Sequence, residues 1–199
     1  MSKKLLIATT NRGKILEITE ILGDPELELI LPGDMGLTLE VAETGATYAD
    51  NARLKSVAYA SVSGLIALGD DSGLEVDALG GAPGLHTARF AGPGASDADR
   101  WNLLLGKLAG LPVASRAARF RCAVAIARPN GAVAIAEGAC EGRIAFAPAG
   151  SGGFGYDPVF FMPDHNCTLA ELPASIKNRI SHRARALLAA RPLIEAAFT

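Results

Sequence analysis

The sequence predicts an α/β fold with a mixed β-sheet and flanking helices. Short apolar runs alternate with segments of helical periodicity, which is typical of βα units. A long β-hairpin follows these units at 120–135, and a purely parallel sheet would not contain one. The 199 residues include no repeat, low-complexity tract or linker, so we expect a single domain over residues 1–199.

The first third of the chain is predicted to alternate between strand and helix. Apolar residues at helical spacing begin after Lys14 and end before Gly23, so a helix follows the first strand and a polar turn over 9–13. Thr47 and Asp50 form a capping pair at the start of a second helix. The predicted strands cover 4–8, 27–31 and 65–68, and the predicted helices cover 14–22 and 47–61.

The rest of the chain predicts further strands and two more helices. A polar turn over 69–73 closes the strand at 65–68, and a strand resumes at 74–76. Ser96 and Asp99 cap a helix with an apolar face over 101–108. Alternating apolar residues on both sides of Asn130-Gly131 predict a hairpin with a type I′ turn. A short strand at 159–161 and a helix from about Ser181, interrupted near Pro192, complete the prediction.

Charge and cysteine usage exclude several classes of protein. The 19 basic and 21 acidic residues give a net charge of −2, which disfavours non-specific binding to nucleic acid. Cys122, Cys140 and Cys167 lie far apart and form no Cys-x-x-Cys motif, so neither a disulfide framework nor a zinc site is expected. The apolar run at 5–8 is too short for a signal peptide, and no run approaches a membrane span. We therefore expect a cytoplasmic protein with no membrane or nucleic-acid partner.

A first candidate site lies between the first strand and the first helix. It consists of Thr9, Thr10, Asn11, Arg12, Gly13 and Lys14. Backbone N–H groups at a helix start favour an anion, and a lysine adds positive charge, so this segment is a candidate phosphate site. It is not a Walker loop, because Ala8 stands where glycine is required and Ile15 where Ser or Thr would hold magnesium. An ordinary turn with a solvated lysine is the alternative.

A second candidate site, at the carboxyl end of a predicted strand, contains Asp70, Asp71 and Ser72. Carboxylates there are suitable ligands for Mg²⁺, which commonly takes one or two of them together with substrate phosphates. Neighbouring carboxylates on a regular strand point to opposite faces, so only one would face a given site. Asp, Ser and Gly are also ordinary turn residues, which is the structural alternative.

Three weaker patterns accompany these sites. Glu43 precedes a helix on which Asn51 and Lys55 share a face, a pattern that by itself decides nothing. The glycines around Phe154 would let the backbone approach a ligand and leave a ring face free for stacking, although a flexible turn is the commoner reading. Basic residues His182 and Arg183 would oppose the helix dipole, so the pattern indicates either function or a solvated basic patch.

Taken in order, these segments resemble the inosine triphosphate pyrophosphatase family, the Ham-type noncanonical purine nucleoside triphosphate pyrophosphatases. The resemblance covers essentially the whole chain, and several motifs at fitting distances make it strong. The matching stretches are Thr-x-Asn-x-Gly-Lys at 9–14, Glu43-Thr44-Gly45, Asn51-Ala52 with Lys55, Asp70-Asp71-Ser72-Gly73-Leu74, Gly80-Gly81-Ala82-Pro83-Gly84, Ala88-Arg89-Phe90, Arg119-Phe120, Gly152 to Pro158, and Lys177 with Ser181-His182-Arg183.

The resemblance implies an elongated fold with two lobes around a central nucleotide-binding cleft, a requirement for Mg²⁺, and a homodimer. The implied reaction converts ITP, dITP or XTP to the monophosphate and pyrophosphate, which clears deaminated purines from the nucleotide pool. Asp71 would be the general base or the acid that organises the metal, and Glu43 would help to hold Mg²⁺. The implied phosphate-binding residues are Thr9 to Lys14 and Lys55, and Ser72 would contact the substrate. The loop of Phe154, Gly155, Tyr156 and Asp157 would enclose the base and sugar. Lys177, His182 and Arg183 would recognise the edge of the base.

Two other functions remain open at the level of sequence. One is a Maf-type pyrophosphatase that acts on modified pyrimidines or other nucleotides. The basic residues Lys177, His182 and Arg183 favour recognition of a purine 6-oxo group instead. The other is a non-catalytic nucleotide-binding module, which would tolerate loss of Asp71. Pyrophosphate release from ITP, dATP and dUTP would separate all three functions.

Overall fold

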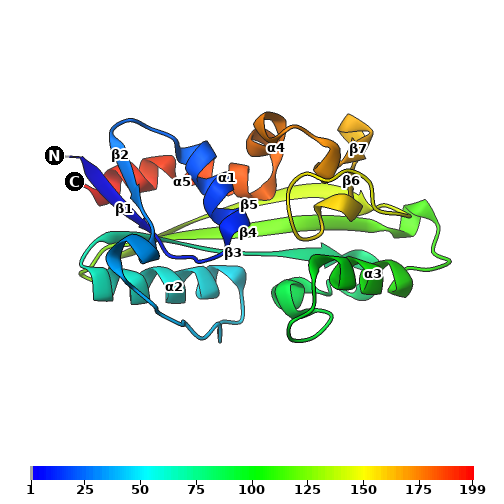
Figure 1. Cartoon of the computed structure of the whole chain (residues 1–199), viewed down its shortest axis with the longest axis horizontal. Helices are drawn as coiled ribbons and strands as arrows, with labels where there is room; N and C mark the ends of the chain where they lie inside the picture. The colour runs from blue at the N-terminus through cyan, green and yellow to red at the C-terminus, as the bar shows by residue number, and fades with distance from the viewer. Residues whose placement is uncertain (1) are drawn as a thin grey trace. The chain divides into compact units, whose positions relative to one another are not determined.

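The computed structural model describes residues 2–199 and confirms the mixed α/β class. One open sheet has the hydrogen-bonded strand order β2-β1-β3-β4-β5-β6-β7. β1 runs parallel to β2 and β3, whereas β6 runs antiparallel to β5 and β7, so the sheet is mixed. The strands are β1 (Lys3–Ile7), β2 (Leu27–Ile30), β3 (Ile66–Val76), β4 (Ala117–Ala127), β5 (Val133–Ile144), β6 (Phe160–Met162) and β7 (Cys167–Thr168) (Figure 1).

The described chain divides into two compact units, each with its own hydrophobic core. The first unit contains residues up to Asp71, together with Cys122–Gly138 and His182–Thr199. The second unit contains Ser72–Arg121 and Ala139–Ser181. The helices are α1 (Arg12–Leu22), α2 (Tyr48–Ser63), α3 (Asp97–Lys107), α4 (Ala174–Ile180) and α5 (His182–Ala197). None of these helices is long and apolar enough to cross a membrane.

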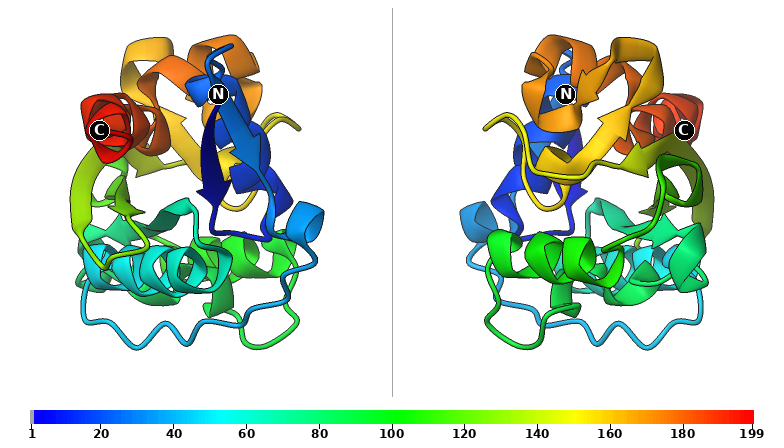
Figure 2. Two further views of the ribbon diagram at one scale, coloured as in Figure 1. Left: turned by 90° about the vertical axis from the view of Figure 1, so that its left-hand side faces the viewer. Right: turned by 90° about the vertical axis from the view of Figure 1, so that its right-hand side faces the viewer.

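The first unit has three layers because β1 is apolar on both faces. Leu5 and Ile7 pack with the apolar sides of α1 and α5. Leu6 and Ala8 point to the other face and pack with Tyr59 of α2. The sheet of this unit therefore lies between α1 and α5 on one side and α2 on the other, as Figures 1 and 2 show.

The second unit is built around aromatic and aliphatic side chains from α3, the ends of β3–β5, and β6. Leu104 of α3 and Leu108, the residue directly after this helix, are fully buried. Phe120 of β4 and Phe160 of β6 pack with ring centroids 4.6 Å apart. Tyr156, in the loop before β6, belongs to the same core and is 2% exposed.

Local signals placed the starts of α2 and α3 correctly, whereas α1 begins at Arg12, before the predicted start at Lys14. Thr47 and Asp50 cap α2 reciprocally, and Ser96 and Asp99 do the same for α3. The side chain of Asn11 caps α1 by accepting a hydrogen bond from the backbone of Lys14. These side chains accept hydrogen bonds from N–H groups that the first helical turn leaves without partners. The same local hydrogen bonds therefore explain both the sequence pattern and the start of the helix.

The predicted polar turn over 69–73 is wrong, because β3 continues through it from Ile66 to Val76. Gly69 packs against α2 so closely that a Cβ atom would lie 2.2 Å from the backbone oxygen of Ala52. Asp70 and Asp71 form ion pairs with Lys14 and Lys55 and do not face water. Distant partners therefore stabilise an extended conformation in a segment whose composition is typical of a turn.

The hairpin between β4 and β5 is present, but its turn is not of type I′. Of the two residues predicted to form it, only Gly131 has a positive φ, of 90°, whereas type I′ requires positive φ at Asn130 as well. Gly131 N donates to Arg128 O at 2.9 Å, and Arg128 N donates to Ala132 O at 2.8 Å. Pro129 fixes a negative φ at the second turn position, which selects a three-residue loop with glycine in the left-handed position.

The C-terminal helix α5 is not interrupted at Pro192 but continues to Ala197. Proline removes the N–H donor that would bond to the carbonyl of Leu188. Leu188 is 46% exposed, so water can take the place of the missing donor on this side of the helix. The short helix α4 and the two-residue strand β7 carry weak sequence signals and were not predicted.

Candidate active site

The loop between β1 and α1 presents a helix start next to a fixed positive charge. Thr9 Oγ1 accepts a hydrogen bond from Asn11 N at 3.2 Å, and Asn11 Oδ1 accepts one from Lys14 N at 3.1 Å. The first turn of α1 contains no acidic residue, whereas Thr10 and Arg12 are exposed beside it. A helix N-terminus with basic neighbours and no acid of its own favours an anion such as phosphate.

Lys14 lies in a buried network of charges centred on Asp70. Its ammonium is 2.5 Å from Asp70 Oδ1, and Arg183 Nε donates to Asp70 Oδ2 at 3.0 Å. Arg183 also pairs with Glu17 of α1. Asp70 and Arg183 are each 1% exposed. All four charged groups belong to the first unit, where α1, β3 and α5 supply them.

The cations of this network keep Asp70 ionised. Burial alone would raise the pKa of the Asp70 carboxyl, but Arg183 and Lys14 outweigh burial and hold the pKa well below its usual value. The Cys122 thiol lies 3.0 Å from Asp70 Oδ2, and burial together with this carboxylate raises the pKa of the thiol well above normal. A carboxylate held ionised by cations is a poor proton acceptor, and Asp70 is the shared ion-pair partner of Lys14 and Arg183.

Asp71 lies in a different environment, together with Lys55 and Asn51 of α2. Lys55 Nζ lies 3.0 Å from Asp71 Oδ1 and also 3.0 Å from Glu43 Oε1. Asn51 Nδ2 donates to Asp71 Oδ2 at 3.3 Å. Burial raises the pKa of Asp71 and outweighs the opposing effects of Lys55 and Lys14. Asp71 is thus the more basic of the two neighbouring carboxylates.

Asn51 lies in the candidate site, although sequence reasoning noted only the helix face it shares with Lys55 and gave it no role. It is 2% exposed, and its Oδ1 accepts a hydrogen bond from Gly45 N at 2.8 Å while its amide bonds to Asp71. A Cβ atom on Gly45 would lie 2.4 Å from the side chain of Asp50, so only glycine lets this segment approach α2. Its spacing of four from Lys55 was the available signal, but that spacing is equally typical of a solvated face.

The donor set around Lys55 fits the magnesium ion that the resemblance implies. Glu43 and Asp71 come from separate segments and direct one oxygen each toward the same ammonium group. Mg²⁺ prefers such hard oxygen ligands and commonly combines one or two carboxylates with substrate phosphates. Within residues 2–199 no group of three or more His, Cys, Asp or Glu side chains is placed to hold a metal by itself. A metal here would therefore need ligands from substrate or water.

The second unit contains only part of the predicted base-binding set, around one buried ion pair, whereas His182 and Arg183 belong to the first unit. Lys177 and Asp157 pair with each other, and they are 4% and 3% exposed. Asp157 Oδ2 also accepts a hydrogen bond from Phe154 N at 2.9 Å. The ammonium of Lys177 lies 5.2 Å from the centroid of the Phe154 ring. A Cβ on Gly153 would lie 2.0 Å from Asp157 Oδ2, so glycine is required for this packing.

Three further predicted residues are placed as follows. Tyr156 packs in the core of the second unit, and its hydroxyl donates to Thr87 O at 3.1 Å. Burial raises the pKa of Tyr156, so its hydroxyl stays protonated. Ser72 is half-buried directly after Asp71 on β3, and His182 is 5% exposed as the first residue of α5.

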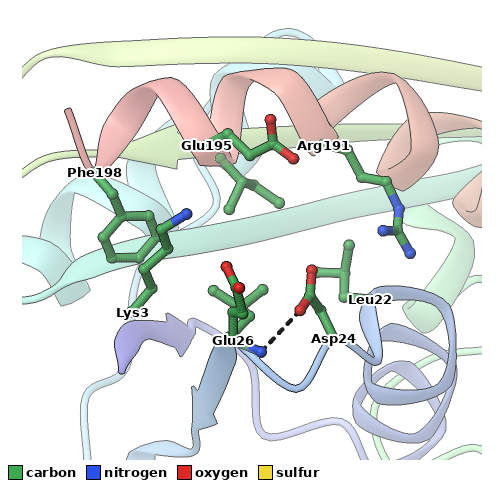
Figure 3. A pocket seen from close by; sticks show the side chains of 9 residues that line it. Lys3, Leu22, Asp24, Glu26, Arg191, Glu195 and Phe198 are labelled. Carbon is green, nitrogen blue, oxygen red and sulfur yellow. Dashed lines mark hydrogen bonds between the residues drawn. The ribbon is translucent and has the colours of Figure 1, made fainter. Parts of the chain in front are cut away.

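A pocket in the first unit lies apart from the predicted residues. It is bordered by the start of β1, the end of α1 and the end of α5, and none of the predicted site residues lines it (Figure 3). Glu26 N donates there to the carboxylate oxygen Asp24 Oδ1 at 2.8 Å, and Lys3 and Arg191 add positive charge. Its mixture of charges indicates no particular ligand.

Comparison with known proteins finds relatives of similar sequence and similar fold. The model of the Ham1 family matches residues 5–193. A dITP/XTP pyrophosphatase from Desulforamulus reducens is 49% identical over 191 residues, which cover 96% of this chain and 95% of that protein. The structure of a HAM1 protein from Coxiella burnetii has a TM-score of 0.86 at 39% identity and covers 100% of this chain and 99% of its own.

A second solved structure, a nucleoside-triphosphatase / dITP/XTP pyrophosphatase from Mycobacterium abscessus, has a TM-score of 0.75 at 41% identity. It covers 95% of this chain and 99% of its own. The fold, the two neighbouring carboxylates with different partners and these full-length similarities lead to one conclusion: the chain belongs to the Ham1 family.

Proposed function

We propose that this protein is a Mg²⁺-dependent pyrophosphatase that hydrolyses ITP, dITP and XTP to the monophosphate and pyrophosphate. Its relatives from Desulforamulus reducens and Geobacillus kaustophilus, at 49% and 48% identity, are dITP/XTP pyrophosphatases. The observation that carries the proposal is the position of Lys55 between Glu43 and Asp71, at 3.0 Å from each carboxylate. This arrangement concentrates metal-binding oxygens and a phosphate-binding cation in one place.

The phosphates would be bound by backbone hydrogen-bond donors and by two positively charged side chains. The start of α1 offers backbone N–H groups, and Lys14 and Lys55 offer ammonium groups. Glu43 and Asp71 would hold Mg²⁺, which when bound neutralises phosphate charge and favours loss of pyrophosphate. Phosphoryl transfer depends mainly on such positioning and neutralisation, so a covalent nucleophile is unnecessary.

Asp71 would accept the proton of the attacking water. The water oxygen forms a bond to the α-phosphorus, the bond to the β-phosphate bridging oxygen breaks, and pyrophosphate leaves with that oxygen. The raised pKa of Asp71 makes it a better proton acceptor than an ordinary aspartate. Asn51 keeps the carboxylate oriented through its hydrogen bond of 3.3 Å. Asp70 remains ionised and keeps Lys14 in place.

Selection of the base would depend on hydrogen-bond donors of the protein that face the 6-oxo group of the purine. Lys177 and Arg183 can only donate hydrogen bonds, so they match hypoxanthine and xanthine and oppose the 6-amino group of adenine. Phe154 would stack on the base, with Gly155, Tyr156 and Asp157 completing the loop, and Ser72 and His182 would contribute further substrate contacts. Arg183 lies in ion pairs with Asp70 and Glu17, so contact with a base would require one of these pairs to rearrange.

Three broader properties accompany this proposal. We propose that residues 1–199 act as one domain and that the protein is a homodimer, as the resemblance implies. A cytoplasmic location follows from the proposed role in the nucleotide pool. The net charge of −2 supports a small nucleotide and not a nucleic acid as the partner.

The direct test is product analysis with ITP and Mg²⁺ in water labelled with ¹⁸O. We expect IMP and pyrophosphate, with the label in the IMP phosphate, because the attacked atom is the α-phosphorus. Release of IDP and inorganic phosphate would contradict the proposed cleavage site. Chelation of the metal should stop both products, and activity that survives chelation would contradict the role of Glu43 and Asp71.

A further inference from the structure

The loop that contains Phe154 is fixed at three successive residues by different parts of the second unit. Phe154 N donates to Asp157 Oδ2 at 2.9 Å, which is a contact within the loop. Gly155 N donates to Asp97 Oδ2 at 2.7 Å, and Tyr156 Oη donates to Thr87 O at 3.1 Å. Two of these three contacts are thus made by the segment 84–100, which contains no residue assigned to nucleotide binding.

Asp97 is suited to hold the loop because its own position is fixed. It is the first residue of α3, and its other carboxylate oxygen pairs with Arg100 one turn later. Arg100 Nη1 in turn donates to Ala95 O at 2.6 Å and to Ala88 O at 3.0 Å. The side chain of Arg100 is 19% exposed. This ion pair and these hydrogen bonds therefore connect the backbone before α3 to the amide of Gly155.

Gly155 requires such a contact because of its backbone conformation. Its φ is +63°, in the left-handed region that glycine adopts freely. No atom lies within 4 Å of where its Cβ would be, so packing against a side chain does not fix this residue. The hydrogen bond from its N–H to Asp97 ties the backbone directly after Phe154 to the start of α3, in addition to the turn that Asp157 N closes by donating to Phe154 O at 3.3 Å.

Thr87 fixes the next residue through a second set of contacts. Its hydroxyl accepts a hydrogen bond from Leu74 N at 2.9 Å and donates to Gly84 O at 2.6 Å. Its own carbonyl accepts the hydrogen bond from the buried Tyr156. The strand β3 and the loop before β6 are thereby joined through this one residue.

We propose that Asp97 is a positioning residue for nucleotide binding, which holds the ring of Phe154 in place through the amide of Gly155 and is itself oriented by Arg100. This inference rests on the proposed function, because it assigns the loop to the base of the substrate. Asp97 does not touch the reacting atoms. Its removal should therefore weaken nucleotide binding and leave the chemical step unchanged.

The first experiment measures the loop without any nucleotide. Amide hydrogen exchange of Gly155, followed by NMR, should be slow in the wild type and clearly faster in Asp97→Ala. Asp97→Asn keeps an oxygen acceptor for Gly155 N and should recover most of the protection. The matched control is Asp99→Ala, which removes the two hydrogen bonds that Asp99 Oδ2 accepts from Ser96 at the start of α3 but no contact with the loop. It should leave Gly155 protected.

The second experiment measures steady-state hydrolysis of ITP by the same variants. Asp97→Ala should raise KM by roughly tenfold with unchanged kcat, the size expected for loss of one charge-assisted hydrogen bond. Asp99→Ala should keep a KM near that of the wild type. An equal rise in KM for both variants would assign the effect to the stability of α3 and overturn the proposal.

The two experiments distinguish failure of this inference from failure of the proposed function. If the wild type hydrolyses ITP but Asp97→Ala leaves either the exchange of Gly155 or KM unchanged, the positioning role is refuted and the function stands. If the wild type does not hydrolyse ITP, the proposed function is refuted, and the role of Asp97 in nucleotide binding is refuted with it. The exchange data then describe only the structure of the loop.

Discussion

Asp70 and Asp71 are neighbours on β3 whose side chains meet different partners. A strand directs successive side chains to opposite faces, so Asp70 meets Lys14 and Arg183 while Asp71 meets Lys55. The pKa of Asp70 is lowered and that of Asp71 is raised, although both are buried. The difference in their partners separates an ionised orienting carboxylate from a candidate proton acceptor.

The substitution Asp71→Asn tests the assignment of the proton acceptor. It is expected to reduce kcat for ITP by at least about a hundredfold, because a general base typically contributes this much. The fold should persist, since an amide of the same shape can still accept the hydrogen bond from Lys55, although its NH2 group cannot accept the one from Asn51. Turnover near the wild-type rate in a folded variant would contradict the assignment.

Glu43→Gln tests the proposed metal ligand. The change removes one charged hard-oxygen ligand and leaves the size of the side chain nearly unchanged, so a higher Mg²⁺ concentration should be needed for half of the maximal rate. A magnesium titration at saturating ITP measures this. If the titration curve coincides with that of the wild type, Glu43 serves only as the structural partner of Lys55.

Arg183→Ala tests the buried charge network. Removal of the guanidinium leaves Asp70 and Glu17 with less compensation inside the protein, and breaking a buried ion pair in this way costs roughly 3–5 kcal/mol of unfolding free energy. Urea unfolding measures the loss, with the exposed Arg185→Ala on the same helix as the control. Equal stability of the two variants would show that the network contributes little to folding.

Residue identity indicated candidate members of the site but not the partners that each of them meets. The carboxylates at 70 and 71 were identified from their place after an apolar run, but their division of roles depends on partners far away in the chain. Arg183, for example, is 113 residues from Asp70. Glu17 and Cys122 gave no signal of their own, because an acid on a helix and a cysteine on a strand are ordinary until their neighbours are known.

At the scale of elements, local signals succeeded where the cause of the structure is local. The caps of α2 and α3 depend on residues three apart, and the sequence predicted both. The continuation of β3 through Gly69 depends on close packing with α2, and composition alone predicted a turn. The turn after β4 was assigned from Asn130-Gly131, although Pro129 restricts the loop to another type.

Gly69→Ala tests the contact between β3 and α2. The added Cβ would lie 2.2 Å from Ala52 O and 2.8 Å from Ser56 N, so β3 and α2 must move apart. We expect a loss of about 1–3 kcal/mol of unfolding free energy, as overpacking usually causes, together with reduced activity because Asp70 and Asp71 follow directly.

Gly106→Ala in α3 is the matched control for this substitution. Nothing lies within 4 Å of its added Cβ, so this variant should be as stable as the wild type or slightly more stable. The same urea unfolding series measures both variants. A Gly69→Ala protein as stable as Gly106→Ala would contradict the close packing of β3 on α2.

At the scale of the whole molecule, the two units contain different parts of the proposed machinery. The first unit contains the candidate metal ligands and phosphate-binding residues, and the second contains Phe154, Asp157 and Lys177. Membership of the Ham1 family joins these parts into one proposed activity on noncanonical purine nucleotides. The proposed activity is therefore defined by its substrate, a noncanonical purine nucleotide, and by its product, pyrophosphate.

The most direct test of this activity measures pyrophosphate release from ITP, dATP and dUTP. The three substrates are compared with the same enzyme and the same Mg²⁺ concentration. We expect ITP to be hydrolysed faster than dATP by a factor on the order of 10⁴ in kcat/KM. The reason is that the buried donors of Lys177 and Arg183 would meet the 6-amino group of adenine, which is itself a donor. Release of pyrophosphate from dUTP should also be slow. Fastest hydrolysis of dUTP, or binding of ITP without any turnover, would contradict the account.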